Sequence, residues 1–275
     1  MLPSESPLLT ADVIQTLDGA RRAGVAVAQC SLDLRRSTTQ VQIQGECWIW
    51  NGMRYPYPQT HKAHTVYHWT EGRFQAVARF GTSLIKLVPT DWGPPTFEID
   101  GIKMLPTAKI SPYDDAERKV GMIQPRAKVI LDCCGGLGYF ADWCLRGHAR
   151  QILSFEMNAD VLWLRSLNPW SPKPHPALSL TQADIAQAVK SLATASVDAV
   201  LHDPPRFAIA GDLYSQAFYE ELSRVMKRRG RMFHYTGTPN QASRGRDLAG
   251  EVSRRLTQAG FQARREGDGI LAIKQ

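Results

Sequence analysis

The second half of the chain alternates short apolar runs with amphipathic segments, and this alternation restricts the possible folds more than any other feature. The runs cover Val129 to Asp132, Gln151 to Glu156, Val197 to His202 and Met232 to Thr236, with a weaker one at Leu178 to Thr181. Such runs are typical of buried parallel strands, and the segments between them are typical of crossover helices. The sequence therefore predicts an α/β domain with an open, mostly parallel sheet.

The end of the chain departs from this alternation. Phe261 to Glu266 and Ile270 to Lys274 are joined by a Gly-Asp-Gly turn, which predicts that the sheet finishes with an antiparallel hairpin. Helices are predicted at Tyr139 to Arg146, Ala159 to Leu167, Asp184 to Leu192, and Tyr214 to Lys227 with a stop at Gly230.

The first half has a different texture. A helix is predicted at Ala11 to Arg21, and β-branched and aromatic runs broken by turn residues follow, such as Thr39 to Trp50. The dipeptide Asp100-Gly101 suits a type I′ hairpin, because both turn positions need positive φ. We therefore expect a small, β-rich domain over residues 1–110 and an α/β domain over residues 111–275, which opens with a helix at Pro112 to Ile123.

Composition narrows the class of protein. With 43% hydrophobic residues, and no apolar run near the roughly 18 residues of a spanning helix, we expect a soluble, cytoplasmic protein without a membrane partner. The five cysteines show no CxxC spacing, so neither a disulfide framework nor a metal site is expected. The net charge of +7 comes from residues 221–275, which hold 12 basic and 5 acidic side chains. This segment predicts either a surface for RNA phosphates or an ordinary solvated face.

A glycine-rich segment follows the first strand of the α/β domain. Asp132 ends the strand, and Gly135, Gly136 and Gly138 open the next helix, where a ligand could approach the backbone closely. The glycines also satisfy the GxGxxA pattern of dinucleotide sites. However, Asp132 would repel a pyrophosphate and attract the ammonium group of an amino-acid-bearing nucleotide. The segment therefore favours S-adenosylmethionine over NAD.

Two more acids follow strands of the same sheet. Glu156 ends the second strand, from which its carboxylate could accept both ribose hydroxyls; the alternative is an ordinary acid at a strand end. Asp184 comes just after the third strand, where it could accept the adenine amino group or cap the helix that begins at Ile185.

The segment His202-Asp-Pro-Pro-Arg-Phe207 follows the fourth strand. Two prolines fix φ, so the acid before them projects rigidly at the edge where ligands bind in open α/β sheets. Asp203 is the first candidate for a catalytic residue. His202 is either a second one or a hydrogen-bonded structural residue, and Arg206 either pairs with an anionic acceptor or forms a salt bridge. Residues expected to face the acceptor are Pro204, Pro205, Phe207, His234 and Tyr235.

At these motifs the chain resembles class I S-adenosylmethionine-dependent methyltransferases. It is most similar to a largely archaeal branch with the motifs LDxCxGLGY, HDPPRF and FHYTG, present here as Leu131 to Tyr139, His202 to Phe207 and Phe233 to Gly237. Gly135 stands where the branch is expected to have Thr. The resemblance implies a Rossmann-like seven-stranded sheet with an antiparallel last strand. It also implies cofactor contacts at Asp132, Gly135, Gly138, Glu156 and Asp184, to which we add the adjacent Gly136 and Ile185.

Three functions are compatible with these residues. The first is methyl transfer to an RNA base or an anionic small molecule, with Asp203 as the proton acceptor. The second is aminopropyl transfer, because the layout of a small β domain before the same fold is similar to spermidine synthases. The third is a module that binds nucleic acid through residues 221–275 and has a vestigial cofactor pocket. A covalent route like that of enzymes methylating C5 of uracil is disfavoured, unless Cys133 or Cys134 reaches the pocket.

Overall fold

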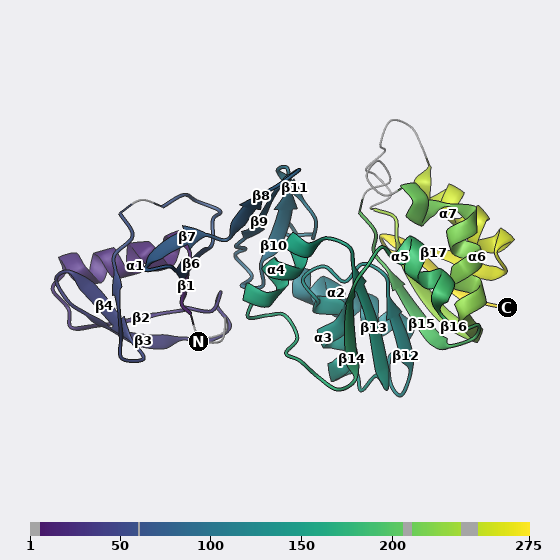
Figure 1. The fold of residues 1–275 in the computed structure, drawn as a ribbon, viewed down its shortest axis with the longest axis horizontal. Coiled ribbons are helices and arrows are strands. Elements are labelled where there is room, and N and C mark those ends of the chain that lie inside the picture. Colours follow the sequence, from purple (N-terminus) through teal and green to yellow (C-terminus); the bar gives the residue numbers. More distant parts are fainter. Residues whose placement is uncertain (1–5, 60, 206–210, 238–246) are drawn as a thin grey trace. The chain divides into compact units, whose positions relative to one another are not determined.

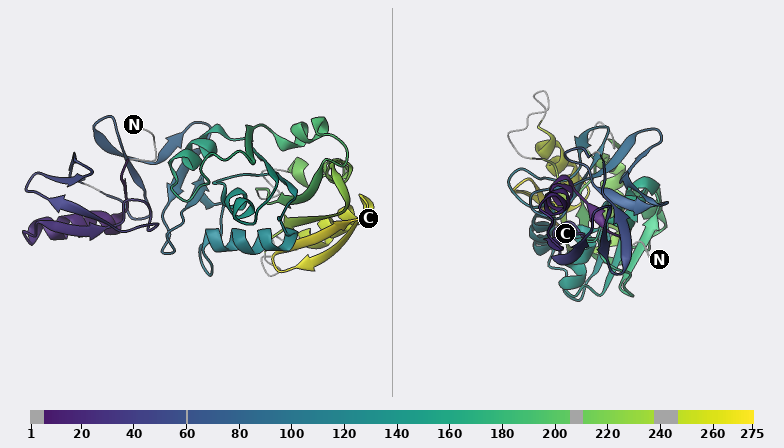
Figure 2. Two further views of the ribbon diagram at one scale, coloured as in Figure 1. Left: turned by 90° about the horizontal axis from the view of Figure 1, so that it is seen from below. Right: turned by 90° about the vertical axis from the view of Figure 1, so that its left-hand side faces the viewer.

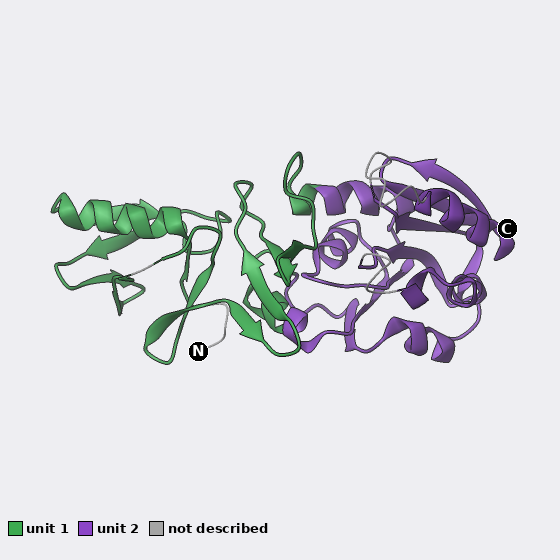
Figure 3. Ribbon diagram, turned by 90° about the horizontal axis from the view of Figure 1, so that it is seen from above, with its two compact units in different colours: residues 1–114, 163–171 green, residues 115–162, 172–275 purple. Residues whose placement is uncertain are grey.

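The computed structural model describes residues 6–59, 61–205, 211–237 and 247–275. It divides the chain into two compact units (Figure 1, Figure 3). Unit 1 consists of Met1–Asp114 and Trp163–Ser171, and unit 2 consists of Asp115–Leu162 and Pro172–Gln275. The sequence predicts a division at residue 110, and it does not anticipate that Trp163–Ser171 belongs with the N-terminal part.

Unit 1 consists of antiparallel strands and one long helix, α1 (Ala11–Arg22). In its described residues the strands form three sheets. One sheet has the order β1 (Leu8–Leu9), β6 (Tyr67–Thr70), β7 (Arg73–Ala76), and a second has the order β2 (Val27–Cys30), β3 (Thr39–Ile43), β4 (Cys47–Trp50), β5 (Met53–Pro56). The third has the order β11 (Ile102–Lys103), β10 (Thr96–Ile99), β9 (Leu84–Val88), β8 (Ala78–Phe80). The predicted β-rich N-terminal region is therefore confirmed. The predicted run Thr39 to Trp50 is two strands, because the chain turns at residues 44–46.

Backbone angles confirm the hairpin turn predicted in unit 1. Asp100 and Gly101, between β10 and β11, have φ angles of 49° and 78°. Glu71 and Gly72, between β6 and β7, have φ angles of 51° and 75°. Positive φ at both central residues is what a type I′ turn requires, and its twist matches that of the flanking strands.

Tryptophans pack inside unit 1. The side chain of Trp48 is fully buried, and its ring stacks on Tyr55 with the centroids 4.6 Å apart. Trp170, from the short second segment of the unit, donates its indole N–H to the carbonyl of Leu34 at 2.9 Å. These residues therefore contribute packing and hydrogen bonds to unit 1.

Unit 2 contains one seven-stranded sheet. Its strand order is β14 (Leu178–Gln182), β13 (Gln151–Glu156), β12 (Val129–Asp132), β15 (Val197–His202), β16 (Met226–Tyr235), β18 (Gly269–Lys274), β17 (Phe261–Glu266). All pairs are parallel except those of β18, which is antiparallel to β16 and to β17 (Figure 2). The sheet has the Rossmann-like methyltransferase arrangement, with the predicted antiparallel hairpin at its end.

Helices cover both faces of this sheet (Figure 1). Residues of α5, α6 and α7 pack on β12, β15, β16 and β18 in one hydrophobic core, and α3 lies on the opposite face. The helices and 3₁₀ turns are α2 (Pro112–Ile123), α3 (Tyr139–Arg146), α4 (Ala159–Leu167), α5 (Ile185–Ala188), η2 (Val189–Ser191), η3 (Gly211–Tyr214), α6 (Gln216–Val225) and α7 (Leu248–Gln258). Within the described ranges, none of the helices has the length and apolar character needed to cross a membrane.

The region before the fifth strand differs from the prediction. The predicted helix Tyr214 to Lys227 ends at Val225, and β16 starts at Met226. The register between β15 and β16 shifts there, so that Val197 pairs with Met226 and Ala199 with Arg231. A Cβ at Gly230 would lie 2.8 Å from the carbonyl oxygen of Lys227. This glycine therefore serves a close approach in an irregular strand and does not end a helix.

Candidate functional site

The strand order of unit 2 reverses beside β12, because β13 lies on one side of it and β15 on the other. In open α/β sheets, ligands bind outside the carboxyl ends of the strands at such a switch point. Residues that follow β12, β13, β14 and β15 are therefore the candidates for a site. They include the acids that the sequence analysis identified.

The glycine loop after β12 has the geometry that glycine permits. Gly136 and Gly138 have φ angles of 48° and 86°, and Gly138 caps the start of α3. Asp132, at the end of β12, is buried, and its Oδ2 accepts a hydrogen bond of 2.8 Å from the Ser154 hydroxyl. The loop is fixed to β13, because the N–H of Gly135 donates to the carbonyl of Phe155 at 2.7 Å.

Glu156 lies against this loop. Its Oε2 accepts a hydrogen bond of 3.0 Å from the backbone N–H of Gly136, and its Oε1 accepts one of 2.9 Å from the N–H of Asn158. The structure thus brings together the first and second predicted cofactor motifs, which lie 20 residues apart. The carboxylate is also held in one orientation at the end of β13.

Asp184 caps the start of α5, which was the alternative to its predicted contact with the adenine amino group. Its Oδ1 accepts a hydrogen bond of 2.9 Å from the N–H of Ala186, and α5 starts at the next residue. Ile185 is buried in the hydrophobic core of unit 2. Contacts of these two residues with a cofactor stay predictions.

Asp203, directly after β15, forms an ion pair with a buried lysine. Its Oδ2 lies 2.9 Å from Nζ of Lys119 on α2, and the same ammonium group lies 2.9 Å from Oδ2 of Asp115. The Lys119 side chain is only 2% exposed. Arg118 extends the network, because it lies 2.8 Å from Asp115 and 2.7 Å from Asp268. A chain of alternating charges therefore joins the turn before β18 to the end of β15.

The charges in this network oppose the cost of burial. Burial raises the pKa of Asp203, and the neighbouring ammonium of Lys119 lowers it, leaving it above its usual value. Burial lowers the pKa of Lys119, but Asp203 and Asp115 raise it by more, so that its pKa lies above its usual value. Lys119 is therefore charged at neutral pH.

The two histidines of the predicted site are fully buried. The Nε2–H of His202 donates to the carbonyl of Leu213, with the two atoms 2.9 Å apart, and Nε2 of His234 lies 2.9 Å from the hydroxyl of Tyr219. Burial lowers the pKa of His202 to about 4 and that of His234 well below its usual value. Both rings are therefore neutral at pH 7, and these contacts favour the structural interpretation of His202.

The remaining predicted residues lie beside Asp203 or outside the described ranges. Tyr235 ends β16, and Nζ of Lys119 lies 4.2 Å from the centroid of its ring. Pro204 is buried, and the carbonyl of Pro205 accepts a hydrogen bond of 3.1 Å from the Tyr214 hydroxyl. Arg206 and Phe207 are outside the described residues, and their roles stay predictions.

The thiols near the glycine loop are poor nucleophiles. Burial raises the pKa of Cys133 and of Cys134 well above the usual value, and the negative charges of Glu156, Asp132 and Asp203 raise the pKa of Cys134 further. Because the thiolate is the reactive form, a covalent cysteine mechanism is disfavoured.

Lys119 is not among the predicted site residues, although its position on α2 carries a signal. Ala116, Val120 and Ile123 form the buried stripe of this helix, and Lys119 lies on the same stripe, four residues after Asp115. A lysine on an apolar helical face is almost always paired. The pair with Asp203 was not predictable, because 84 residues separate the two.

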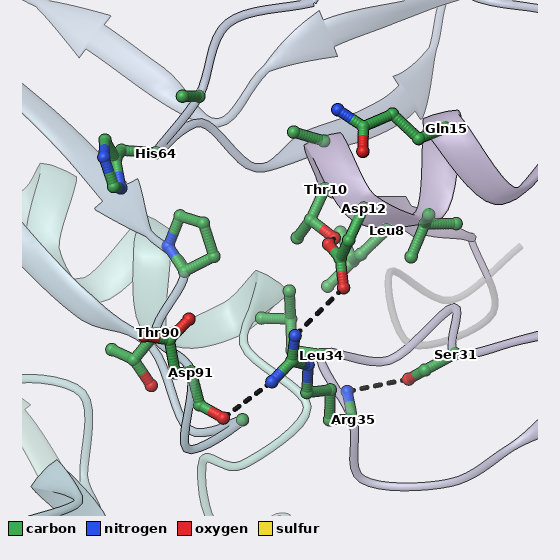
Figure 4. Close-up of a pocket in the computed structure, with 15 residues that line it drawn as sticks. Leu8, Thr10, Asp12, Gln15, Ser31, Leu34, Arg35, His64, Thr90 and Asp91 are labelled. Carbon is green, nitrogen blue, oxygen red and sulfur yellow. Dashed lines mark hydrogen bonds and ion pairs between the residues drawn. The ribbon is translucent and has the colours of Figure 1, made fainter.

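Unit 1 has a cavity of its own, of about 300 Å³ (Figure 4). The guanidinium of Arg35 reaches across it, 3.1 Å from Asp12 and 2.6 Å from the carbonyl oxygen of Asp91. Ser31 and Thr90 also line the cavity. None of the predicted site residues is among its lining residues.

Comparison with solved structures shows the same fold. A spermidine synthase in complex with the transition-state analogue AdoDATO is 16% identical, and the similarity covers 72% of each chain with a TM-score of 0.58. A spermidine synthase from Thermotoga maritima is 17% identical over 72% of this chain and 71% of that one, with a TM-score of 0.56. At these identities the similarity concerns the fold.

Comparison of sequences identifies a family. No family model matches the chain. A curated relative is the uncharacterized protein MJ1233 of Methanocaldococcus jannaschii, which is 37% identical over 214 residues, covering 76% of this chain and 73% of that protein. The chain therefore belongs to the same family as MJ1233.

Proposed function

We propose that the chain is an S-adenosylmethionine-dependent methyltransferase that acts on an RNA base or an anionic small molecule. The observation that carries the proposal is the hydrogen bond between Glu156 and the glycine loop. It lies at the switch point of the sheet, at the same edge as Asp203, which follows β15. A carboxylate suited to a nucleotide and a proton acceptor thereby lie at the ends of β13 and β15, the two strands that flank β12. In the proposed reaction, Glu156 binds the cofactor and Asp203 accepts the proton.

The residues fit an amino-acid-bearing nucleotide. Gly136 and Gly138 have no side chain, which permits their positive φ angles and lets a ligand approach the loop backbone closely. Asp132 supplies a buried carboxylate for an ammonium group. The carboxylate of Glu156 suits ribose hydroxyls, which donate hydrogen bonds. The residues proposed to hold the cofactor are Asp132, Gly135, Gly136, Gly138, Glu156, Asp184 and Ile185.

When bound, S-adenosylmethionine supplies a methyl group on a positively charged sulfur; as the methyl group is transferred, the C–S bond breaks and its electron pair stays on the sulfur. Asp203 accepts the proton that the acceptor loses as its nitrogen or oxygen bonds to the methyl carbon. Pro204 and Pro205 hold the backbone after Asp203 rigid, which keeps the carboxylate in place. His202 and His234 support the strand ends, in agreement with their burial.

Replacing Glu156 with glutamine is expected to weaken cofactor binding by about 10- to 100-fold. A hydrogen bond to a charged group contributes about 1.5–3 kcal/mol, and Gln keeps the size of the side chain without its charge. Calorimetric titration with S-adenosylhomocysteine measures the effect. Glu221→Gln is the matched control, because Glu221 pairs with Arg224 on α6. An unchanged Kd for Glu156→Gln would contradict the assignment of the cofactor site.

The second candidate function is aminopropyl transfer. Two observations favour it: the fold is shared with spermidine synthases, and the network at Asp203 has three carboxylates against two cations. One excess negative charge is compatible with a cationic polyamine acceptor. Arg206, which follows Asp203 by three residues in the sequence, argues against this acceptor if it has its predicted place at the site, because a cation would repel a polyamine.

RNA stays the proposed macromolecular partner, through residues 221–275. Many cations of this segment have other contacts in unit 2: Lys227 pairs with Asp198 and Arg265 with Asp247, and the guanidinium of Arg255 donates to the carbonyl of Tyr214. Arg228 and Arg229, by contrast, are exposed on the irregular part of β16. These two arginines are the strongest candidates for phosphate contacts.

One experiment separates the acceptor classes and the two reactions. The protein is incubated with methyl-labelled S-adenosylmethionine, or with decarboxylated S-adenosylmethionine labelled in the aminopropyl group, and with cell extract split into RNA, protein and metabolite fractions. We expect methyl label in the RNA or metabolite fraction. Methyl label in the protein fraction alone, or aminopropyl label alone, would contradict the proposed function.

A further inference from the structure

Lys119 is the most deeply buried cation near the proposed acceptor site, and the reaction described above gives it no part. Its ammonium group lies 2.9 Å from both Asp203 and Asp115. It also lies 4.2 Å from the ring centroid of Tyr235 and 5.6 Å from that of Phe140. Two carboxylates and two aromatic rings thus surround a charge that is almost completely removed from water.

We propose that Lys119 is a positioning residue that holds one oxygen of Asp203 and keeps this carboxylate ionised for the acceptor's proton. The inference rests on the proposed function, because it assigns Asp203 the same part in the reaction. It adds a residue on α2, far away in the sequence, that sets both the orientation and the charge of Asp203.

The orientation follows from the contacts of Asp203. Within the described residues, its side chain has one hydrogen-bond partner, which is the ammonium group of Lys119 on Oδ2. Oδ1 is therefore the oxygen left for a proton from the acceptor. The Lys119 side chain cannot swing away without leaving the carboxylate of Asp115 as well, because it bridges the two.

The ionised state of Asp203 follows from the charged and titratable groups around it. Burial makes the carboxylate of Asp203 costly to ionise, and an opposite charge at 2.9 Å compensates for part of this cost. The other titratable groups that interact with Asp203 are Asp115 on α2, Asp268 in the turn before β18, Tyr235 on β16, Tyr214 in η3 and Cys134 after β12. Lys119 is the only cation that touches Asp203 in the described part of the chain. Among the described groups that interact with Asp203, only acids and neutral groups would remain without Lys119, and Asp203 would take up a proton at higher pH.

The test is the variant Lys119→Met, which keeps the length of the side chain and removes its charge. We expect the ascending limb of the pH–rate profile of methyl transfer to move up by at least one pH unit. On that limb the turnover should fall by at least about tenfold and recover at higher pH, with the Kd for S-adenosylhomocysteine changed less than threefold. A merely structural part for Lys119 would lower the rate equally at all pH values.

Lys86→Met is the matched control. It removes an ion pair of 2.9 Å with Glu98, on strands of unit 1 that contribute no residue to the proposed site. Its pH–rate profile should superimpose on that of the unmodified protein. An equal shift in both variants would overturn the inference, because it would be a general effect of a lost positive charge.

A direct titration separates failure of this inference from failure of the proposed function. The carboxyl carbon of Asp203 is followed by carbon-13 NMR in protein labelled on aspartate, with the signal assigned from Asp203→Asn. This measurement needs no turnover. Absence of any methyl transfer would reject the proposed function alone, whereas an Asp203 pKa that is equal in Lys119→Met and the unmodified protein would overturn the inference. If Lys119→Met does not fold, the double variant Lys119→Met with Asp115→Asn is used, in which Asp203 is the one carboxylate left of the two that contact Lys119. The pKa of Asp203 is then compared between this variant and Asp115→Asn alone.

Discussion

Replacing Asp203 with alanine is expected to abolish methyl transfer, with a loss of about 100- to 10,000-fold, the range typical of a general base. Asp203 is the acid that follows β15, and within the described residues its side chain bonds only to Lys119. Cofactor affinity should stay within about tenfold, because the proposed cofactor contacts come from other segments. Turnover is measured with methyl-labelled donor and the acceptor fraction that gains label, and affinity by calorimetry.

Two further variants complete this experiment. Asp203→Asn keeps the size of the side chain and should lose turnover to a similar extent, which separates the loss of charge from the loss of packing. Asp18→Ala, on α1 in unit 1, removes an acid outside the site and should keep normal turnover. Full activity of Asp203→Ala would reject the assignment of Asp203 as the proton acceptor.

Replacing Gly269 with alanine is expected to lower the free energy of unfolding by about 3 kcal/mol. A Cβ at this position would lie 2.4 Å from the carbonyl oxygen of His234 and 2.6 Å from Cζ of Phe233. Gly269 begins β18, where it pairs with Tyr235 and Glu266 on its two neighbouring strands. Because backbone hydrogen bonds fix both sides, the strand cannot shift without loss of pairing.

Urea denaturation followed by circular dichroism measures this change. Gly121→Ala is the matched control, since nothing lies within 4 Å of a Cβ at this position in α2. Alanine is about 0.5–1 kcal/mol better than glycine inside a helix, so the control should stabilise the protein slightly. The same unfolding midpoint for Gly269→Ala and the unmodified protein would contradict the packing seen at the start of β18.

Much of unit 2 could be predicted from local patterns. The apolar runs give the strands, and the Gly-Asp-Gly turn gives the final hairpin, because both depend on residues close in sequence. The hydrogen bond between Glu156 and Gly136 was also within reach, since each ends or follows a strand at the same edge of the sheet.

The parts that were missed depend on distant residues. Met226 to Gly230 reads as the end of a helix, yet it is strand because it pairs beside Val197. Lys119 lies on the apolar stripe of α2, which indicates a partner, but only the folded chain brings it to Asp203. Local propensity is overridden wherever a partner from another part of the chain supplies the hydrogen bond or the charge.

The segment Trp163–Ser171 has a consequence for cutting this protein into fragments. The polypeptide leaves unit 1 after Asp114, returns to it for nine residues and leaves it again, and Trp170 then supplies a hydrogen bond to Leu34. No single cut in the sequence separates the two units. A fragment that ends at Asp114 would lack Trp163–Ser171, which is part of unit 1.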